Sequence, residues 1–143
     1  MDENCVFCKI VAGEIPSYTV YEDDIVKAFL DISQTTPGHT LVIPKKHVPD
    51  IFAYDQDLAA EVFSRIPRIA KAVRDSDPSI KAMNIVNNNG ELAYQSVFHS
   101  HFHLIPRYSE NDGFGMKFID NSSKYTSEQL QKIQRQIVKQ LEN

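Results

Sequence analysis

Three of the five histidines in the chain stand at every second position of the stretch QSVFHSHFHLIPR, residues 95–107. They are His99, His101 and His103. A neutral imidazole can bind a transition metal, attack phosphorus or relay a proton at physiological pH. Side chains alternate between the two faces of a strand. A strand over 97–105 therefore predicts the three rings on one face, with successive rings roughly 6–7 Å apart.

Three interpretations of this histidine face are open. An edge strand with a polar outer face needs no chemistry, but serine, threonine, lysine or glutamate would serve there equally well. A metal claw suits imidazole, although the stretch contains no acidic residue. In the third interpretation one histidine attacks phosphorus while neighbouring groups hold the phosphate and handle protons. Just upstream, Asn88, Gln95 and Ser96 offer amides and a hydroxyl that bond phosphate oxygens without adding charge.

The only two cysteines, Cys5 and Cys8, form a CVFC motif near the start of the chain. Such a pair is either redox-active or half of a zinc site that needs two further ligands. No thioredoxin-like βαβ pattern follows the motif, which disfavours the redox interpretation.

The elements that must position these side chains follow from hydrophobic spacing and turn residues. A short helix is expected from Cys5 to just before Gly13, and a longer one over 55–74, with a kink or break at Pro67. Thr126 and Gln129 form the capping box of a terminal helix over 126–141. The expected strands cover 19–21, 25–32, 39–44, 81–88 and 97–105. This content predicts an α+β fold with a mainly antiparallel five-stranded sheet.

Length and composition limit the possible classes. The 143 residues fit a single domain over 1–143, in which 108–143 form a C-terminal extension ending in a helix. A net charge of −4, with no basic run longer than Lys45-Lys46, argues against a nucleic-acid partner. The absence of an apolar run of roughly 18 residues argues against a membrane span, and the N-terminus lacks the basic start of a signal peptide. The expected compartment is the cytoplasm, where a disulfide is not expected.

The segment from His99 to Ile105, HSHFHLI, resembles the motif of the histidine triad (HIT) family of nucleotide hydrolases and transferases, in which histidines alternate with apolar residues. The likeness extends to CVFCKIVAGEIPS, VYEDDIVKAFLDIS, PGHTLVIPKKH, NNNG and HLIPRY, and so to nearly the whole chain. It is greatest for the bacterial zinc-containing branch with a C-terminal extension. Two residues depart from the pattern: Ser100 takes an apolar position, and Tyr94 stands where many members have glycine.

The resemblance implies that His101 attacks the α-phosphate of a purine nucleotide and that water then releases a nucleoside monophosphate. His103 would contact the phosphate and assist, and His39 would complete the cluster. By the same resemblance Asp31 would accept hydrogen bonds from the ribose hydroxyls, although a turn or cap role is equally compatible with its position. The family's phosphate-contacting positions match Asn88, Gln95 and Ser96. The walls of its base pocket match Phe7, Ile10, Phe29 and Ile32, which hydrophobic spacing alone would assign to the core.

The resemblance further implies one structural zinc ion per chain, no organic cofactor and a homodimer. The implied ligands are Cys5, Cys8, His47 and His99, a closed Cys2His2 set. His47 is otherwise an ordinary exposed loop histidine. A zinc-bound His99 could not donate a proton, so proton handling would fall to His103, to solvent or to the substrate.

The function predicted from the sequence is hydrolysis of a nucleoside phosphoramidate or a related nucleoside-phosphate compound through a covalent nucleotidyl-histidine. Hydrolysis of dinucleoside polyphosphates is an alternative within this class. Two other classes stay open: a metal-dependent hydrolase that uses all three histidines, and a non-catalytic module that binds nucleotides or a partner. The bulky Tyr94 is expected to crowd the leaving-group side or to redirect the loop, and so to affect substrate choice more than chemistry.

Overall fold

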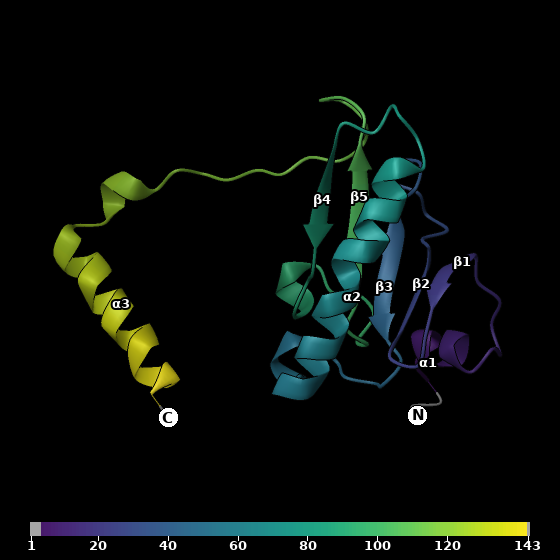
Figure 1. Ribbon diagram of the computed structural model, residues 1–143. Helices are drawn as coiled ribbons and strands as arrows, with labels where there is room; N and C mark the ends of the chain where they lie inside the picture. Colours follow the sequence, from purple (N-terminus) through teal and green to yellow (C-terminus); the bar gives the residue numbers. More distant parts are fainter. Residues whose placement is uncertain (1–3, 143) are drawn as a thin grey trace.

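A computed structural model describes residues 4–142 and shows a five-stranded antiparallel sheet with strand order β1-β2-β3-β5-β4 (Figure 1). The predicted α+β class and the antiparallel five-stranded sheet are confirmed. The strands are β1 (Thr19–Glu22), β2 (Val26–Leu30), β3 (Thr40–Pro44), β4 (Ala82–Val86) and β5 (Phe102–Arg107). The helices are α1 (Val6–Val11), α2 (Gln56–Asp75) and α3 (Ser127–Leu141), with short 3-10 turns η1 (Ile51–Ala53), η2 (Glu91–Ala93) and η3 (Ser122–Lys124).

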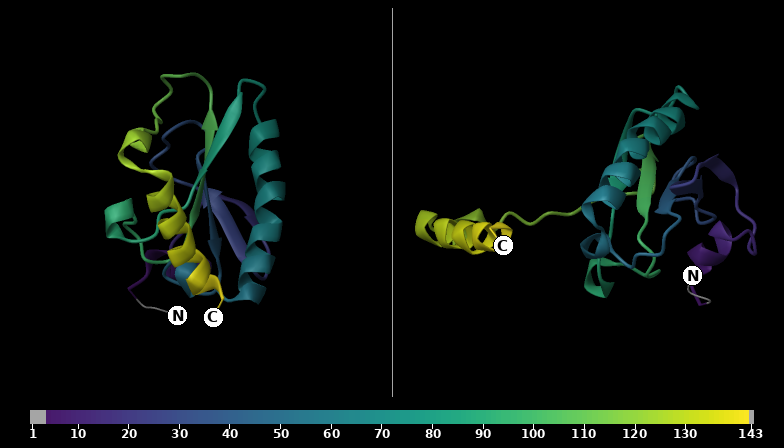
Figure 2. Two further views of the ribbon diagram at one scale, coloured as in Figure 1. Left: turned by 90° about the vertical axis from the view of Figure 1, so that its left-hand side faces the viewer. Right: turned by 60° about the horizontal axis from the view of Figure 1, so that its bottom comes forward.

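The helix α2 covers one face of the sheet, as Figures 1 and 2 show from different sides. Asp55 caps its N-terminus by accepting a hydrogen bond from the Leu58 N–H at 2.8 Å. A kink or a break was expected at Pro67; the helix runs through this residue without interruption, so the prediction of a break was wrong. Proline removes only one intrahelical donor, and burial of the apolar face holds the helix together across it. The core residues on this face are Val26, Ala28, Val42, Val62, Ile66, Ile69, Val73, Phe102 and Leu104.

The short helix α1 lies on the opposite face of the sheet from α2 (Figure 2). Strand side chains alternate, so β2 and β3 send Phe29, Leu41 and Ile43 toward α1, where they pack with Phe7, Cys8 and Ile10. In β5, the residues on either side of His103 belong to the α2 core. The same alternation therefore turns His103 toward the face that carries α1.

The strand β5 begins only at Phe102, so the prediction of one strand carrying all three triad histidines was wrong. Residues 97–101 lie outside the sheet because other groups hold this segment. The Ser100 N–H donates to the Val48 carbonyl at 2.7 Å, and the Ser100 hydroxyl lies 2.9 Å from the Tyr54 hydroxyl. His99 is consequently free to turn away from the other two rings, and its side chain is fully buried.

The C-terminal segment leads away from the sheet and ends in α3, which has no buried residue (Figure 2). The predicted capping box is confirmed: Thr126 accepts from the Gln129 N–H, and the Gln129 side chain accepts from the Thr126 N–H. Among residues 4–142, no helix is both long enough and apolar enough to cross a membrane.

Candidate active site and metal centre

The two cysteines and two of the histidines converge beneath α1. Cys5 caps the helix, and its sulfur accepts a hydrogen bond from the Cys8 N–H at 3.2 Å. His99 Nδ1 lies 3.3 Å from Cys5 Sγ and 3.5 Å from Cys8 Sγ. His47 Nδ1 lies 3.3 Å from Cys8 Sγ and 3.2 Å from His99 Nδ1. One short helix, the segment after β3 and the segment before β5 thus meet at four potential ligand atoms.

This cluster fits a zinc ion in both geometry and proton position. Neighbouring ligands of a tetrahedral zinc with sulfur and nitrogen donors lie about 3.3–3.8 Å apart, close to the distances found here. His99 Nε2 donates to the Pro44 carbonyl at 2.8 Å, so the lone pair of the neutral ring is on Nδ1, facing the sulfurs. Burial lowers the pKa of His99 to about 4, which keeps the ring neutral as a ligand requires.

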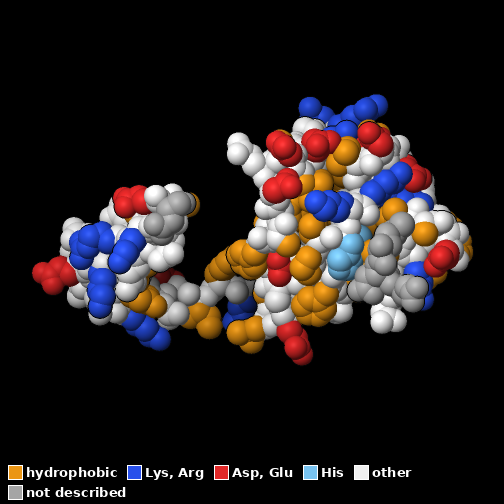
Figure 3. All heavy atoms as spheres, turned by 90° about the horizontal axis from the view of Figure 1, so that it is seen from below, with side chains coloured by type: hydrophobic (Ala, Val, Ile, Leu, Met, Phe, Trp, Pro, Cys, Tyr) orange, Lys and Arg blue, Asp and Glu red, His pale blue; other side chains and the backbone are white. Residues whose placement is uncertain are grey.

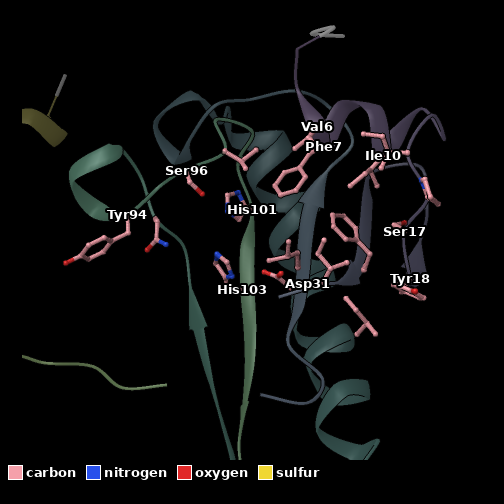
Figure 4. A pocket seen from close by; sticks show the side chains of 18 residues that line it. Val6, Phe7, Ile10, Ser17, Tyr18, Asp31, Tyr94, Ser96, His101 and His103 are labelled. Carbon is pink, nitrogen blue, oxygen red and sulfur yellow. The ribbon is translucent and has the colours of Figure 1, made fainter. Parts of the chain in front are cut away.

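The other two triad histidines line a cavity of about 640 Å³ on the α1 face of the sheet (Figure 4). Its walls come from α1 and the segment after it, the end of β2, and the loop around residues 88–97. Figure 4 shows His101 and His103 between the apolar side chains of α1 and the Ser96 and Tyr94 side chains. The lining residues are Val6, Phe7, Ile10, Ile15, Pro16, Ser17, Tyr18, Phe29, Leu30, Asp31, Ile32, Leu41, Asn88, Tyr94, Ser96, Val97, His101 and His103.

The hydrogen bonds of His101 determine which of its nitrogens carries the lone pair. Nδ1 lies 2.8 Å from the His99 carbonyl, an acceptor, so Nδ1 is the protonated nitrogen of the neutral ring. Nε2 consequently carries the lone pair, in a side chain that lines the cavity. The ring is held on one side by the edge of Phe7, with ring centroids 5.1 Å apart. Just after the end of β4, Asn87 donates to the His101 carbonyl at 2.9 Å and fixes the backbone.

His39 and His103 form a hydrogen-bonded pair with a defined direction. The Thr35 N–H donates to His39 Nδ1 at 3.2 Å, which places the proton of the neutral His39 ring on Nε2. That Nε2 lies 2.9 Å from His103 Nδ1 and donates to it, so the proton of a neutral His103 is on Nε2, at the opposite edge of the ring. The Asp31 carboxylate lies 3.6 Å from His39 Nε2.

Asp31, His39 and His103 lie close enough together to suggest a second metal site, but their protons do not suit one. A metal at this position would need the lone pair of His39 Nε2. The Thr35 N–H already occupies the other nitrogen, so the ring would have to become an imidazolate. We therefore describe this group as a hydrogen-bonded histidine pair beside a carboxylate.

Burial keeps the cavity histidines uncharged. It lowers the pKa of His103 to about 4, with a contribution from the neighbouring His101 and His39. Burial likewise lowers the pKa of His101 and of His39, and the negative charge of Asp31 partly opposes this lowering in both rings. The site thus presents one free imidazole lone pair and one imidazole N–H near neutral pH.

The structure brings most of the expected phosphate and nucleoside residues to this cavity. Asn88 and Ser96 line it. Asp31 also lines it while accepting a hydrogen bond from the Ser33 N–H at 2.8 Å, so both of the roles considered for it are compatible with its position. The four residues expected to wall the base pocket are all among the lining residues: Phe7, Ile10, Phe29 and Ile32.

Gln95, a predicted phosphate ligand, uses its side chain in hydrogen bonds within the protein. Its side chain is 3% exposed and does not line the cavity. Its oxygen accepts from the Gly90 N–H at 2.8 Å, and its nitrogen donates to the carbonyls of Pro49 at 2.6 Å and Val97 at 3.0 Å. Gln95 therefore braces the loop between η2 and the triad.

Several residues that shape the site escaped the sequence interpretation. Tyr18 lines the cavity and is 71% exposed. It was not predicted, because nothing in the sequence distinguishes a tyrosine before a strand from any other surface aromatic residue. The Thr35 N–H that orients His39 is a backbone group, so no residue type could have identified it. In the NNNG turn, Asn87 and Asn89 support the backbone while only Asn88 reaches the cavity, a division that requires the loop conformation.

Known proteins share this sequence and fold over most of their length. The HIT domain family matches residues 12–110. The protein Hit of Bacillus subtilis is 53% identical over 139 residues, 97% of this chain and 95% of its own. An adenosine 5′-monophosphoramidase of Schizosaccharomyces pombe is 38% identical over 113 residues, 79% of this chain and 81% of its own.

Solved structures agree with these relatives. A HIT family member from Bacillus subtilis superposes with a TM-score of 0.92 at 52% identity, covering 96% of both chains. A zinc-bound histidine triad family protein from Mycobacterium smegmatis superposes with a TM-score of 0.72 at 38% identity, covering 84% of this chain and 86% of that one. The fold, the triad and the extent of these matches together show that this chain belongs to the HIT (histidine triad) family.

Proposed function

We propose that this protein hydrolyses the bond between the α-phosphate of a purine nucleotide and a leaving group, through a covalent nucleotidyl-His101 intermediate. One observation carries this proposal: the lone pair of His101 Nε2 and the N–H of His103 belong to adjacent rings that line the same cavity, with centroids 5.1 Å apart. A nucleophile and a hydrogen-bond donor in that arrangement suit attack on a phosphoryl group. The direct test is release of AMP from an AMP phosphoramidate.

In the proposed reaction, His101 Nε2 forms a bond to the α-phosphorus while the bond from phosphorus to the leaving nitrogen breaks. The leaving amine takes the electron pair and one proton. Water then attacks the nucleotidyl-histidine, the bond from phosphorus to Nε2 breaks, and AMP departs. The water returns the proton used in the first step, so the chain ends in its starting state. We assign the hydrogen bond to the phosphoryl oxygens to the His103 N–H. Because that ring is neutral, the proton that the amine takes comes from solvent or from the protonated substrate, and the attacking water returns one proton to solvent.

The substrate choice follows from the two kinds of surface in the cavity. Phe7, Ile10 and Phe29 form an apolar part suited to a purine, and Phe7 also packs against Phe29 with ring centroids 5.8 Å apart. Asp31 lies in the same cavity, where a carboxylate suits the ribose hydroxyls. We favour a phosphoramidate because the Schizosaccharomyces pombe relative is a phosphoramidase. Dinucleoside polyphosphates are the second substrate candidate.

Replacing Asp31 by asparagine is expected to lower kcat/KM for an AMP phosphoramidate about 10- to 100-fold. A hydrogen bond between a carboxylate and two hydroxyls contributes more than a neutral one, and the substitution removes the charge without changing the shape. For the same substrate without its 2′-hydroxyl, Asp31→Asn should lower kcat/KM much less, since one hydroxyl partner of the carboxylate is already missing. Steady-state kinetics with both substrates and both proteins measure this difference.

Asp24→Asn is the matched control, because the Asp24 side chain is 89% exposed and lies outside the cavity. It should leave both substrates at the wild-type rate. Equal losses for the ribose and deoxyribose substrates in Asp31→Asn would exclude a ribose contact and leave Asp31 as a turn residue.

We further propose that Cys5, Cys8, His47 and His99 hold one structural zinc ion. All four ligand positions are provided by the chain, which is typical of structural rather than catalytic sites. When bound, the ion would cross-link α1 to the segment before β5. This closed centre and the proton positions at His39 both disfavour the metal-dependent hydrolase. Paired thiols that serve as ligands also suit a reducing compartment, so we propose the cytoplasm.

We also propose that the chain forms a homodimer in which a second copy covers α3. A solitary 15-residue helix is marginal in water, and this one carries a stripe of exposed apolar residues. Figure 3 shows apolar side chains on this separate arm. The exposed fractions are 55% for Leu130, 40% for Ile133, 59% for Ile137 and 79% for Leu141.

Ile133→Asp combined with Ile137→Asp is expected to weaken the dimer at least about 100-fold, because each change would bury an unpaired charge. Sedimentation velocity over a range of concentrations measures the shift. Gln136→Asp, on the same helix but off the stripe, introduces one negative charge and should leave the dimer intact. A double variant that associates as tightly as the wild type would contradict the role of α3.

A further inference from the structure

The loop that precedes the triad contains an unusual tyrosine. Tyr94 has φ 71° and ψ 19°, and within residues 4–142 it is the one non-glycine residue with a positive φ. The conformation is imposed by a helix-ending motif: the Gln95 N–H donates to the Gly90 carbonyl at 3.1 Å and the Tyr94 N–H to the Glu91 carbonyl at 3.0 Å. Glycine is the residue that favours this position, because a side chain there is strained.

Nothing in the described part of the chain compensates for this strain. The Tyr94 side chain is 87% exposed, and its hydroxyl and ring have no hydrogen-bonding or aromatic partner within residues 4–142. The loop cannot relax easily, because the buried Gln95 side chain ties it to Gly90, Pro49 and Val97. A strained residue without packing, held by a rigid loop beside a candidate active site, points to a role in function.

The position of Tyr94 indicates which part of a substrate it would meet. Figure 4 shows Tyr94 on the opposite side of His101 and His103 from Phe7 and Ile10. In an in-line displacement the leaving group departs on the side of phosphorus opposite the nucleophile. With the nucleoside on the Phe7 side, the open end of the cavity at Tyr94 is where the leaving group extends. The Tyr94 ring points away from the histidines, so it meets only the distal part of a long leaving group.

We propose that Tyr94 is a specificity-determining residue that stacks on a planar aromatic ring several bonds beyond the scissile bond in the leaving group. An exposed tyrosine ring offers a face for such stacking, and its hydroxyl can remain in water. This inference rests on the proposed function and adds the class of leaving group. Two sources share the required chemistry: an arylalkyl amine and the base of a second nucleoside.

The test compares two AMP phosphoramidates that differ only in the ring of the amine, 2-phenylethylamine and 2-cyclohexylethylamine. The two amines have the same length and similar size, but only one ring is planar and aromatic. The wild type should show a higher kcat/KM for the aromatic substrate, and Tyr94→Gly should lower this ratio on the order of ten-fold. Tyr94→Phe should keep the ratio, because it keeps the ring. A dinucleoside triphosphate compared with its analogue lacking the second base tests the nucleoside source in the same way.

Leu92→Ala is the matched control: Leu92 lies in η2, is 98% exposed and does not line the cavity, so its ratio should equal that of the wild type. Tyr94→Gly should fold at least as well as the wild type in thermal unfolding, because glycine removes the strain. An unchanged ratio in Tyr94→Gly overturns the inference, as does a change that occurs only together with loss of the dimer. A wild type that cleaves none of these compounds overturns the proposed function, and this inference with it.

Discussion

Replacing His101 by glycine is expected to lower kcat/KM for an AMP phosphoramidate at least about 10⁴-fold, the scale on which removal of a nucleophile acts. The expected loss follows from the state of the Nε2 nitrogen of His101. The His99 carbonyl holds the proton of the ring on Nδ1, so the lone pair is available on the other nitrogen without any prior deprotonation. No other cavity imidazole has a free lone pair, since His103 Nδ1 accepts a hydrogen bond from His39. Rapid-quench kinetics with purified protein measure the loss.

The covalent intermediate supplies the second readout of this prediction. Acid-quenched wild-type protein should carry one nucleotidyl group, and peptide mass spectrometry should locate it on His101. His101→Gly should carry none, while still binding AMP with an affinity similar to that of the wild type. Added imidazole should restore part of the turnover, because the glycine variant leaves space for an imidazole in the cavity wall.

Two outcomes would contradict this mechanism. Turnover that survives in His101→Gly without added imidazole would remove His101 as the nucleophile. Tight AMP binding by a wild type that forms no adduct and no product would instead support a non-catalytic nucleotide-binding module.

The second large effect is expected at the cysteine and histidine cluster. Cys8→Ser should lower the free energy of unfolding by at least about 3 kcal/mol, because a ligand present at several hundred times its Kd stabilises the folded state by this amount. For a chain of this size that corresponds to a fall in Tm of roughly 10 °C. Elemental analysis should find one zinc per wild-type chain and none in the variant.

The stability of α1 links this centre to catalysis. Phe7 lies between the two cysteines in sequence, and its ring packs against both His99 and His101. Loss of the metal should therefore loosen the wall that holds His101 and lower activity as a consequence of the structural change. Ala12→Ser, at the exposed C-terminal end of the same helix, is the control and should retain zinc, Tm and activity.

Chelation separates a structural zinc from a catalytic one. With a structural ion, activity and near-ultraviolet circular dichroism should decay together as the ion is removed. Activity that disappears at once while the fold persists would support the metal-dependent hydrolase. Cys8→Ser protein that lacks zinc but unfolds at the wild-type temperature would contradict the structural role.

The periodicity of the sequence predicted a helix correctly where apolar residues must repeat at a fixed spacing to bury one face. The apolar residues Val62, Ile66, Ile69 and Val73 recur at helical spacing, so α2 was predictable even though Pro67 lacks one intrahelical hydrogen-bond donor. The capping box of α3 was predictable because it uses two side chains at a fixed separation. Both features depend on local physics that acts within a few residues.

The histidines show where local reasoning fails. A strict alternation predicted three equivalent rings, but residues 97–101 lie outside the sheet, where Ser100 bonds to Val48 and Tyr54. Gln95 shows the same limit, since the bonds of its side chain to Pro49 and Val97 could not be predicted from its residue type. Val48, Pro49 and Tyr54 are near the motif in space, but α2 and β4 separate them from it in the sequence. The bond to Val97 depends on a turn conformation that residue types do not specify.

The sequence by itself determined which chemical groups are present, their family and the antiparallel sheet that carries them. Only the tertiary structure decided what each imidazole does, because the position of its proton depends on backbone groups that have no residue-specific signal. The His99 carbonyl leaves the lone pair of His101 on Nε2, and the Pro44 carbonyl directs that of His99 toward the cysteines. The Thr35 N–H sets the direction of the hydrogen bond between His39 and His103.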